Sequence, residues 1–275
     1  MFQTASVKVT AYAAIVDFTA YVMPKYIILR LFSGRRRHND IQAQLEYGAA
    51  FSTYELIVIS LDIAVDETFG DLSNNAIVTH WAICCRSGIV AGFVAGPPCE
   101  NWIAVRHNLL EDKHSPPPLR SGTHPWGLDS LEYKHYQQLA IGSKLLQVVL
   151  YFFTILLKSG GFALAEHPSP SKTVQQASSI WKLSYTQWLQ VSPAIVAHHF
   201  NQGPHGQVST KPTTFLCLRL PTIDRYLHKY QGGEKKQKAG ILQGTDTTGA
   251  FRTKDAKEYP ESLNRAISNA IIDSL

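Results

Sequence analysis

Cysteine is scarce in this chain, and its spacing excludes two common uses of that residue. The four cysteines are Cys84, Cys85, Cys99 and Cys217. No pair shows the Cys-x-x-Cys spacing of zinc sites and redox motifs, and no regular framework points to disulfides. Histidine supplies no ligand set either, because His198 and His199 are adjacent rather than four residues apart. We therefore expect reduced thiols, no bound metal and an intracellular protein, nuclear or cytoplasmic.

Long apolar runs are also missing. The most apolar stretch, residues 145–157, is shorter than the ~20 residues that a membrane-spanning helix needs, so it predicts a buried core helix. The first residues lack a basic region followed by a continuous apolar core, which argues against a secretory signal. We expect no membrane partner.

Charge and apolar content are ordinary. The formal net charge of +5 is compatible with a polyanionic partner but does not require one. A hydrophobic content of 45% is typical of a globular protein, and 275 residues suffice for one large α/β domain or for a domain with a small appendage.

Apolar runs that end in turn residues alternate with helical patterns between residues 26 and 220. Predicted strands cover residues 26–33, 54–61, 89–95, 162–165, 194–199 and 215–218. Predicted helices cover residues 40–46, 73–85, 130–158 and 173–190. This alternation predicts an α/β domain over residues 26–220. Residues 1–25 are predicted to be a helical extension, and residues 221–275 a flexible segment with a final helix that starts near Pro260 and packs on the core.

One strand ends in an unusual turn. Residues 89–95 are small and apolar without alternation, as in a strand buried on both faces. Gly96-Pro97-Pro98 must end the strand in a rigid turn, because proline donates no backbone hydrogen bond. Cys99 would then lie at the carboxyl edge of the sheet, where open α/β sheets bind ligands. A buried cysteine is the alternative, but the polar residues that follow argue against burial and favour a presented nucleophile.

A second strand delivers a carboxylate in the same way. Residues 162–165 form a short apolar run, and Glu166-His167-Pro168 follows it with a rigid proline. A solvated loop carboxylate is the alternative interpretation. Two such strand exits in this order favour a shared site for Cys99 and Glu166.

Ala95-Gly96-Pro97-Pro98-Cys99 resembles the catalytic loop of the cytosine-5 DNA methyltransferases, in which a Pro-Cys thiolate attacks the target base. The resemblance implies a doubly wound Rossmann-like methyltransferase sheet flanked by helices, with S-adenosylmethionine as cofactor. It also implies that Glu166 contacts the cytosine ring nitrogen, although the family has Glu-Asn-Val where this chain has Glu-His-Pro.

The resemblance extends to the expected cofactor site. Residues 31–34 (Leu-Phe-Ser-Gly) resemble the first methyltransferase motif, but the family has further glycines where this chain continues with three arginines. Asp62 at the end of the second strand could bind ribose hydroxyls or be a turn aspartate. Asp71 could meet the adenine amino group, as the resemblance implies, or cap a helix. The expected cofactor contacts are Phe32, Ser33, Gly34, Asp62, Asp71 and Pro97.

The expected polyanionic partner is DNA, or RNA. Arg35, Arg36 and Arg37 could form a phosphate-binding patch or a solvated face. Arg106 and Arg120 are further candidates for phosphate contact. Lys211 is also a candidate for nucleic-acid binding, and it could supply the charge of the family's Gln-x-Arg-x-Arg element, which Gln202 matches only loosely.

The preferred hypothesis is methyl transfer to C5 of cytosine through Cys99 and Glu166. A catalytically inactive relative that binds nucleic acid is the alternative, favoured by the arginine run and by the lack of a separate target-recognition domain. A methyltransferase for another base or amine ranks last, because such enzymes carry an aromatic residue where this chain has Cys99. The sequence carries no indication of an oligomeric state.

Overall fold

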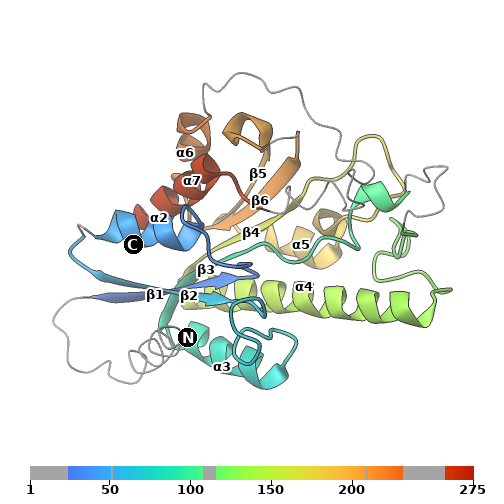
Figure 1. The fold of residues 1–275 in the computed structure, drawn as a ribbon, viewed down its shortest axis with the longest axis horizontal. Coiled ribbons are helices and arrows are strands. Elements are labelled where there is room, and N and C mark those ends of the chain that lie inside the picture. The colour runs from blue at the N-terminus through green and yellow to red at the C-terminus, as the bar shows by residue number, and fades with distance from the viewer. Residues whose placement is uncertain (1–23, 51, 108–115, 208–209, 232–257) are drawn as a thin grey trace.

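The protein is built on a six-stranded mixed sheet with helices on both faces (Figure 1). The computed structural model describes residues 24–50, 52–107, 116–207, 210–231 and 258–275. The strands are β1 (Lys25–Leu31), β2 (Glu55–Leu61), β3 (Val90–Ala95), β4 (Phe162–Pro168), β5 (Ile195–Asn201) and β6 (Pro212–Leu218). Their order is β2-β1-β3-β4-β6-β5; β1 to β4 are mutually parallel, and β6 is antiparallel to both of its neighbours. The predicted α/β class is therefore confirmed.

Three helices cover one face of the sheet: α2 (Ile41–Ala49), α6 (Ile223–Lys229) and α7 (Glu261–Ile272) (Figure 1). In α7 the apolar side chains recur every four residues, and Leu263, Ile267 and Ile271 are fully buried. They pack in one cluster with Ile28 of β1 and Leu164 of β4. The predicted final helix is confirmed, whereas the predicted N-terminal helix lies outside the described residues.

The other face is covered by α3 (Asn75–Arg86), α4 (Tyr133–Ser159) and α5 (Ser184–Leu189). Phe93 of β3 makes edge-to-face contacts with Phe152 and Phe153 of α4, at 6.5 and 6.1 Å between ring centroids. Gly160 ends α4 at a φ of 90°, a left-handed conformation that favours glycine. By length and composition alone α4 could cross a membrane, but here its apolar side packs on the sheet.

Two local predictions are wrong. Residues 173–190 contain only a short 3-10 helix, Ile180–Lys182, and α5. Serine hydroxyls accept backbone N–H groups here, Ser171 from Val174 and Ser179 from Trp181, and such bonds compete with a helix. Strand β4 extends through Pro168 because β6 continues to pair with it, so Glu166 lies in the strand rather than after it. The sequence analysis also missed the seven residues of α6.

The α4–sheet contact gives a first test. We expect Phe152→Ala to lower the free energy of unfolding by about 3–5 kcal/mol, because it empties a fully buried ring site. The neighbouring Tyr151 is 43% exposed, and Tyr151→Ala should cost about 1 kcal/mol or less. Urea denaturation of both variants measures the difference, and equal losses would contradict this packing.

Candidate functional site

The strand order reverses beside β1. The chain places β2 on one side of β1 and then returns to place β3 on the other side. In open α/β sheets, the crevice outside the carboxyl ends of the strands at such a reversal is the usual ligand site. The segments that leave β1 and β3 here are Phe32-Ser33-Gly34 and Gly96-Pro97-Pro98-Cys99.

Strand pairing brings the Cys99 turn next to Glu166. Ala95 of β3 pairs with Ala165 of β4, so the following residues, Gly96 and Glu166, are neighbours. A Cβ atom on Gly96 would lie 3.6 Å from Glu166 Oε2. Cys99 follows three residues later and is partly exposed. Cys99 therefore follows β3, and Glu166 lies in β4 directly after the last residue that pairs with β3, at the same edge of the sheet.

Cys99 differs from the other cysteines in its exposure. Cys84, Cys85 and Cys217 are all buried. Burial raises the pKa of the Cys85 thiol to about 12 and also raises the pKa of Cys217, so both are poor nucleophiles. Cys99 is the accessible thiol of the part of the chain that the structure describes.

Three donors face the Glu166 carboxylate, which is only 6% exposed. Gln202 Nε2 donates to Oε1 at 3.4 Å, and Lys211 Nζ lies 3.5 Å from the same oxygen. The Tyr259 hydroxyl donates to Oε2 at 3.3 Å. Lys211 thus neutralises a buried carboxylate here, whereas the sequence analysis assigned it to nucleic acid. Gln202 also donates to Thr213 Oγ1 and is fully buried.

His167, the next residue of β4, contacts a different set of side chains. Its ring lies against Trp102 and Trp181, with centroids 6.4 and 6.3 Å away. Burial lowers the pKa of His167 to about 3, so the imidazole is neutral at physiological pH and is no proton carrier there.

Arg120 and Arg106 brace the segment after Cys99. The Arg120 guanidinium lies 3.8 Å from the ring centre of Trp102 and donates to the Asn101 side chain, and burial lowers its pKa to about 10. Arg106 donates to the carbonyl oxygens of Glu100 and Pro117. Both arginines are buried, which disfavours the phosphate contacts predicted for them.

The predicted cofactor residues lie at the exits of β1, β2 and β3 and at the turn before α3. The Gly34 N–H donates to Asp62 Oδ2 at 2.8 Å, and the Phe32 N–H donates to the Leu61 carbonyl at 2.9 Å. These hydrogen bonds connect the segment after β1 to the end of β2. Gly34 has a φ of 64° and open space where a Cβ would lie. Asp71 accepts the Ser73 N–H in a turn, and Asn74 rather than Asp71 caps α3.

A buried ion pair organises the segment between β1 and α2. Arg30 Nη1 donates to Asp40 Oδ2 at 2.8 Å, and Asp40 caps α2 by accepting the Ala43 N–H at 2.9 Å. Burial alone would raise the pKa of Asp40, but the Ala43 N–H and the Arg30 charge outweigh it, so the pKa is lowered. Arg36 Nε also donates to Asp40, at 2.9 Å.

The three consecutive arginines therefore have different surroundings. Arg36 pairs with Asp40, and Arg37 pairs with Glu258 at 2.9 Å. Arg35 is exposed. Arg30, Asp40 and Tyr259 were not predicted from the sequence. Arg30 interrupts the apolar run of β1, and a charge buried there needs a counter-charge such as Asp40.

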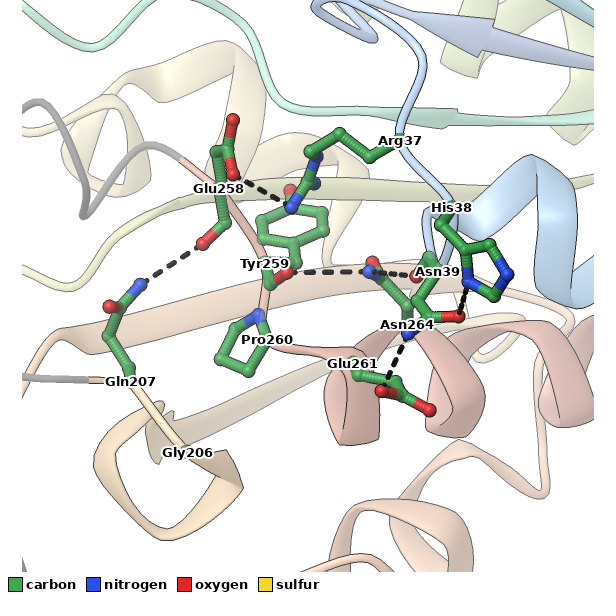
Figure 2. A pocket seen from close by; sticks show the side chains of 10 residues that line it. All are labelled: Arg37, His38, Asn39, Gly206, Gln207, Glu258, Tyr259, Pro260, Glu261 and Asn264. Atoms are coloured by element: carbon green, nitrogen blue, oxygen red, sulfur yellow. Dashed lines mark hydrogen bonds and ion pairs between the residues drawn. The ribbon is translucent and has the colours of Figure 1, made fainter.

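A pocket of about 420 Å³ lies beside Tyr259, between residues 37–39, residues 206–207 and residues 258–264 (Figure 2). Tyr259 is one of its lining residues, and the Tyr259 hydroxyl reaches Glu166. Among the described residues, no three His, Cys, Asp or Glu side chains are grouped so as to hold a metal ion.

Comparison with known proteins adds no family to this geometry. No family model matches the chain, and a search of the curated proteins gave no match. The site itself is the evidence for function: a partly exposed thiol follows β3, and a buried, hydrogen-bonded carboxylate lies on the neighbouring strand β4.

The buried ion pair predicts a pH dependence of stability. Asp40→Asn should lower the free energy of unfolding by about 3 kcal/mol at pH 7, because it leaves Arg30 buried without its counter-charge. The folded pKa of Asp40 lies below the unfolded value of about 3.9, so its ionisation stabilises the fold above that value and ceases to do so as the pH falls through the folded pKa.

The difference between wild type and Asp40→Asn should therefore shrink as the pH falls below about 4 in denaturant titrations. Asp71→Asn, at a turn outside this cluster, is the control and should cost less than about 1 kcal/mol at pH 7. A difference for Asp40→Asn that stays constant with pH would contradict the ion-pair account.

Proposed function

We propose that this protein is an S-adenosylmethionine-dependent methyltransferase that acts on C5 of cytosine in nucleic acid, with Cys99 as nucleophile. The observation that carries the proposal is the pairing of Ala95 with Ala165. It sets the Cys99 turn and the Glu166 carboxylate side by side at the carboxyl edge of the sheet. A target base needs both groups, one at C6 and the other at the ring nitrogen.

We further infer that the sheet is a doubly wound Rossmann-like methyltransferase sheet. The reversal of strand order beside β1 supports this inference, as do helices on both faces and a single strand, β6, that is antiparallel to its neighbours. The thiol turn follows β3 and the carboxylate belongs to β4, in the order that the resemblance to cytosine-5 methyltransferases implies.

The residues at the exits of β1 and β2 fit S-adenosylmethionine. No atom lies within 4 Å of where a Gly34 Cβ would be, so the methionine part could approach this backbone. The Asp62 oxygens accept the Gly34 and Ala64 N–H groups, and each keeps a lone pair that a ribose hydroxyl could use. Asp40 already caps the N-terminus of α2, where a nucleotide phosphate would otherwise bind. S-adenosylmethionine carries no phosphate and does not need that position. Phe32, Ser33, Asp71 and Pro97 complete the proposed contacts.

The mechanism follows from the two side chains. The base is extruded from the stack, and the Cys99 thiolate adds to C6 to form a C–S bond. Glu166 lies at the ring nitrogen and supports its protonation, which makes C6 more electrophilic. The bound cofactor supplies the methyl group that C5 accepts. Water then takes the C5 proton, the electrons of the C5–H bond re-form the C5–C6 double bond, and cleavage of the C–S bond releases the Cys99 thiolate.

The nucleic-acid contacts fall into two groups. Arg35 is exposed and is the proposed phosphate ligand of the arginine run. Arg36, Arg37, Arg106 and Lys211 are hydrogen-bonded or ion-paired within the protein and would have to exchange these partners to reach DNA or RNA.

A catalytically inactive nucleic-acid-binding relative is the second candidate. The segment after Gly34 favours it, because arginines bonded to Asp40 and Glu258 occupy the place where the resembled family has glycines. Calorimetry separates the two candidates, since only the enzyme should give heat with S-adenosylmethionine.

Covalent trapping tests the enzyme. A pool of random-sequence duplexes containing 5-fluorocytosine, mixed with protein and S-adenosylmethionine, should give an adduct visible by mass spectrometry, because fluorine blocks loss of the C5 substituent. Cys99→Ser should abolish the adduct, whereas Cys84→Ser, at a buried thiol, should leave it intact. Glu166→Gln should slow trapping about 100-fold. No adduct with wild type, where a known cytosine-5 methyltransferase reacts, would rule out this function.

A further inference from the structure

Tyr259 reaches the proposed active site from far along the chain. It precedes α7 and is 93 residues from Glu166, yet its hydroxyl donates to Glu166 Oε2 at 3.3 Å. A Cβ atom on Gly96 would lie 2.9 Å from that hydroxyl, too close for an ordinary contact. The glycine of the Gly-Pro-Pro-Cys turn thus leaves the space that the phenol occupies.

Several bonds fix the backbone around Tyr259 (Figure 2). Asn264 Nδ2 donates to the Tyr259 carbonyl at 3.3 Å and to the Asn39 carbonyl at 2.8 Å. The preceding residue, Glu258, accepts from Arg37 at 2.9 Å through its side chain and from Gln207 at 3.0 Å through its carbonyl. Hydrogen bonds to two other segments, residues 37–39 and Gln207, thus hold the backbone of residues 258–264 in the position from which the phenol reaches Glu166.

The charges around the phenol keep it a donor. Burial raises the pKa of Tyr259 well above its usual value, and the Glu166 charge and hydrogen bond raise it further. The Cys99 thiolate charge raises this pKa as well. Gln202 and Lys211 both face Oε1 of Glu166. Among the described residues, the Tyr259 hydroxyl is the donor to Oε2.

We propose that Tyr259 is a positioning residue of the methyl-transfer site, whose hydroxyl fixes the orientation of the Glu166 carboxylate toward the base that Cys99 attacks. This inference rests on the proposed function. Tyr259 acts through Glu166 and makes no contact with the reacting carbon. Its removal should slow the chemical step without weakening the binding of nucleic acid.

The test compares Tyr259→Phe with Tyr230→Phe. Each substitution removes one phenol oxygen; that of Tyr230 accepts a hydrogen bond from Asn269 of α7, outside the site. At saturating 5-fluorocytosine duplex, Tyr259→Phe should form the Cys99 adduct about tenfold more slowly, with the duplex affinity unchanged and the melting temperature lowered by only a few degrees, because one buried oxygen loses its donor. Tyr230→Phe should react at the wild-type rate. An unchanged or faster rate for Tyr259→Phe, while wild type reacts, would overturn the inference but not the proposed function.

A second measurement is independent of catalysis. The pKa of Tyr259, followed by NMR of ring-labelled tyrosine, should be lower in Glu166→Gln than in wild type, because the carboxylate charge is lost. An unchanged pKa would overturn the Tyr259–Glu166 contact itself. If wild type gave no adduct, the proposed function and the role of Tyr259 would both fail, even if this titration behaved as expected.

Discussion

The parallel pairing of β3 with β4 is the constraint on which the site depends. Ala95 and Ala165 are the last residues that pair between β3 and β4. The residues that follow them, Gly96 and Glu166, therefore lie next to each other. A slip of one residue would turn Glu166 to the opposite face of the sheet, where His167 now lies among tryptophans. Fully buried apolar residues on both faces, such as Phe93 and Leu164, oppose any such slip.

Buried charge is the second organising element. Arg30 and Asp40 are both nearly inaccessible, and their ion pair links the end of β1 to the start of α2. Arg36 joins the same carboxylate, while Arg37 reaches Glu258 and so ties this segment to the residue before Tyr259. A continuous set of contacts thus joins the proposed cofactor edge to the carboxylate of the proposed catalytic pair.

Local sequence patterns predicted most of the fold and both proposed catalytic residues. Apolar runs ended by turn residues identify β1, β2 and β3, and the same logic correctly places Cys99 after β3. It wrongly ends β4 before Glu166, because the pairing that extends β4 comes from β6, far along the chain. Tyr259 could not be found in this way, because its contact joins positions 93 residues apart. Arg106 was assigned to nucleic acid because residue type does not reveal burial. Residues 173–190 have helix-like apolar spacing, but local serine hydrogen bonds interrupt the helix.

We propose that the exits of β1, β2 and β3 bind the cofactor beside the Cys99 thiol and the Glu166 carboxylate. A crystal structure of the full chain with S-adenosylhomocysteine would test this arrangement. We expect the ribose at Asp62, the amino-acid part beside Gly34, and the sulfur directed toward the crevice between Cys99 and Glu166. A ligand bound elsewhere, or a Cys99 sulfur enclosed in the core away from Glu166, would contradict it.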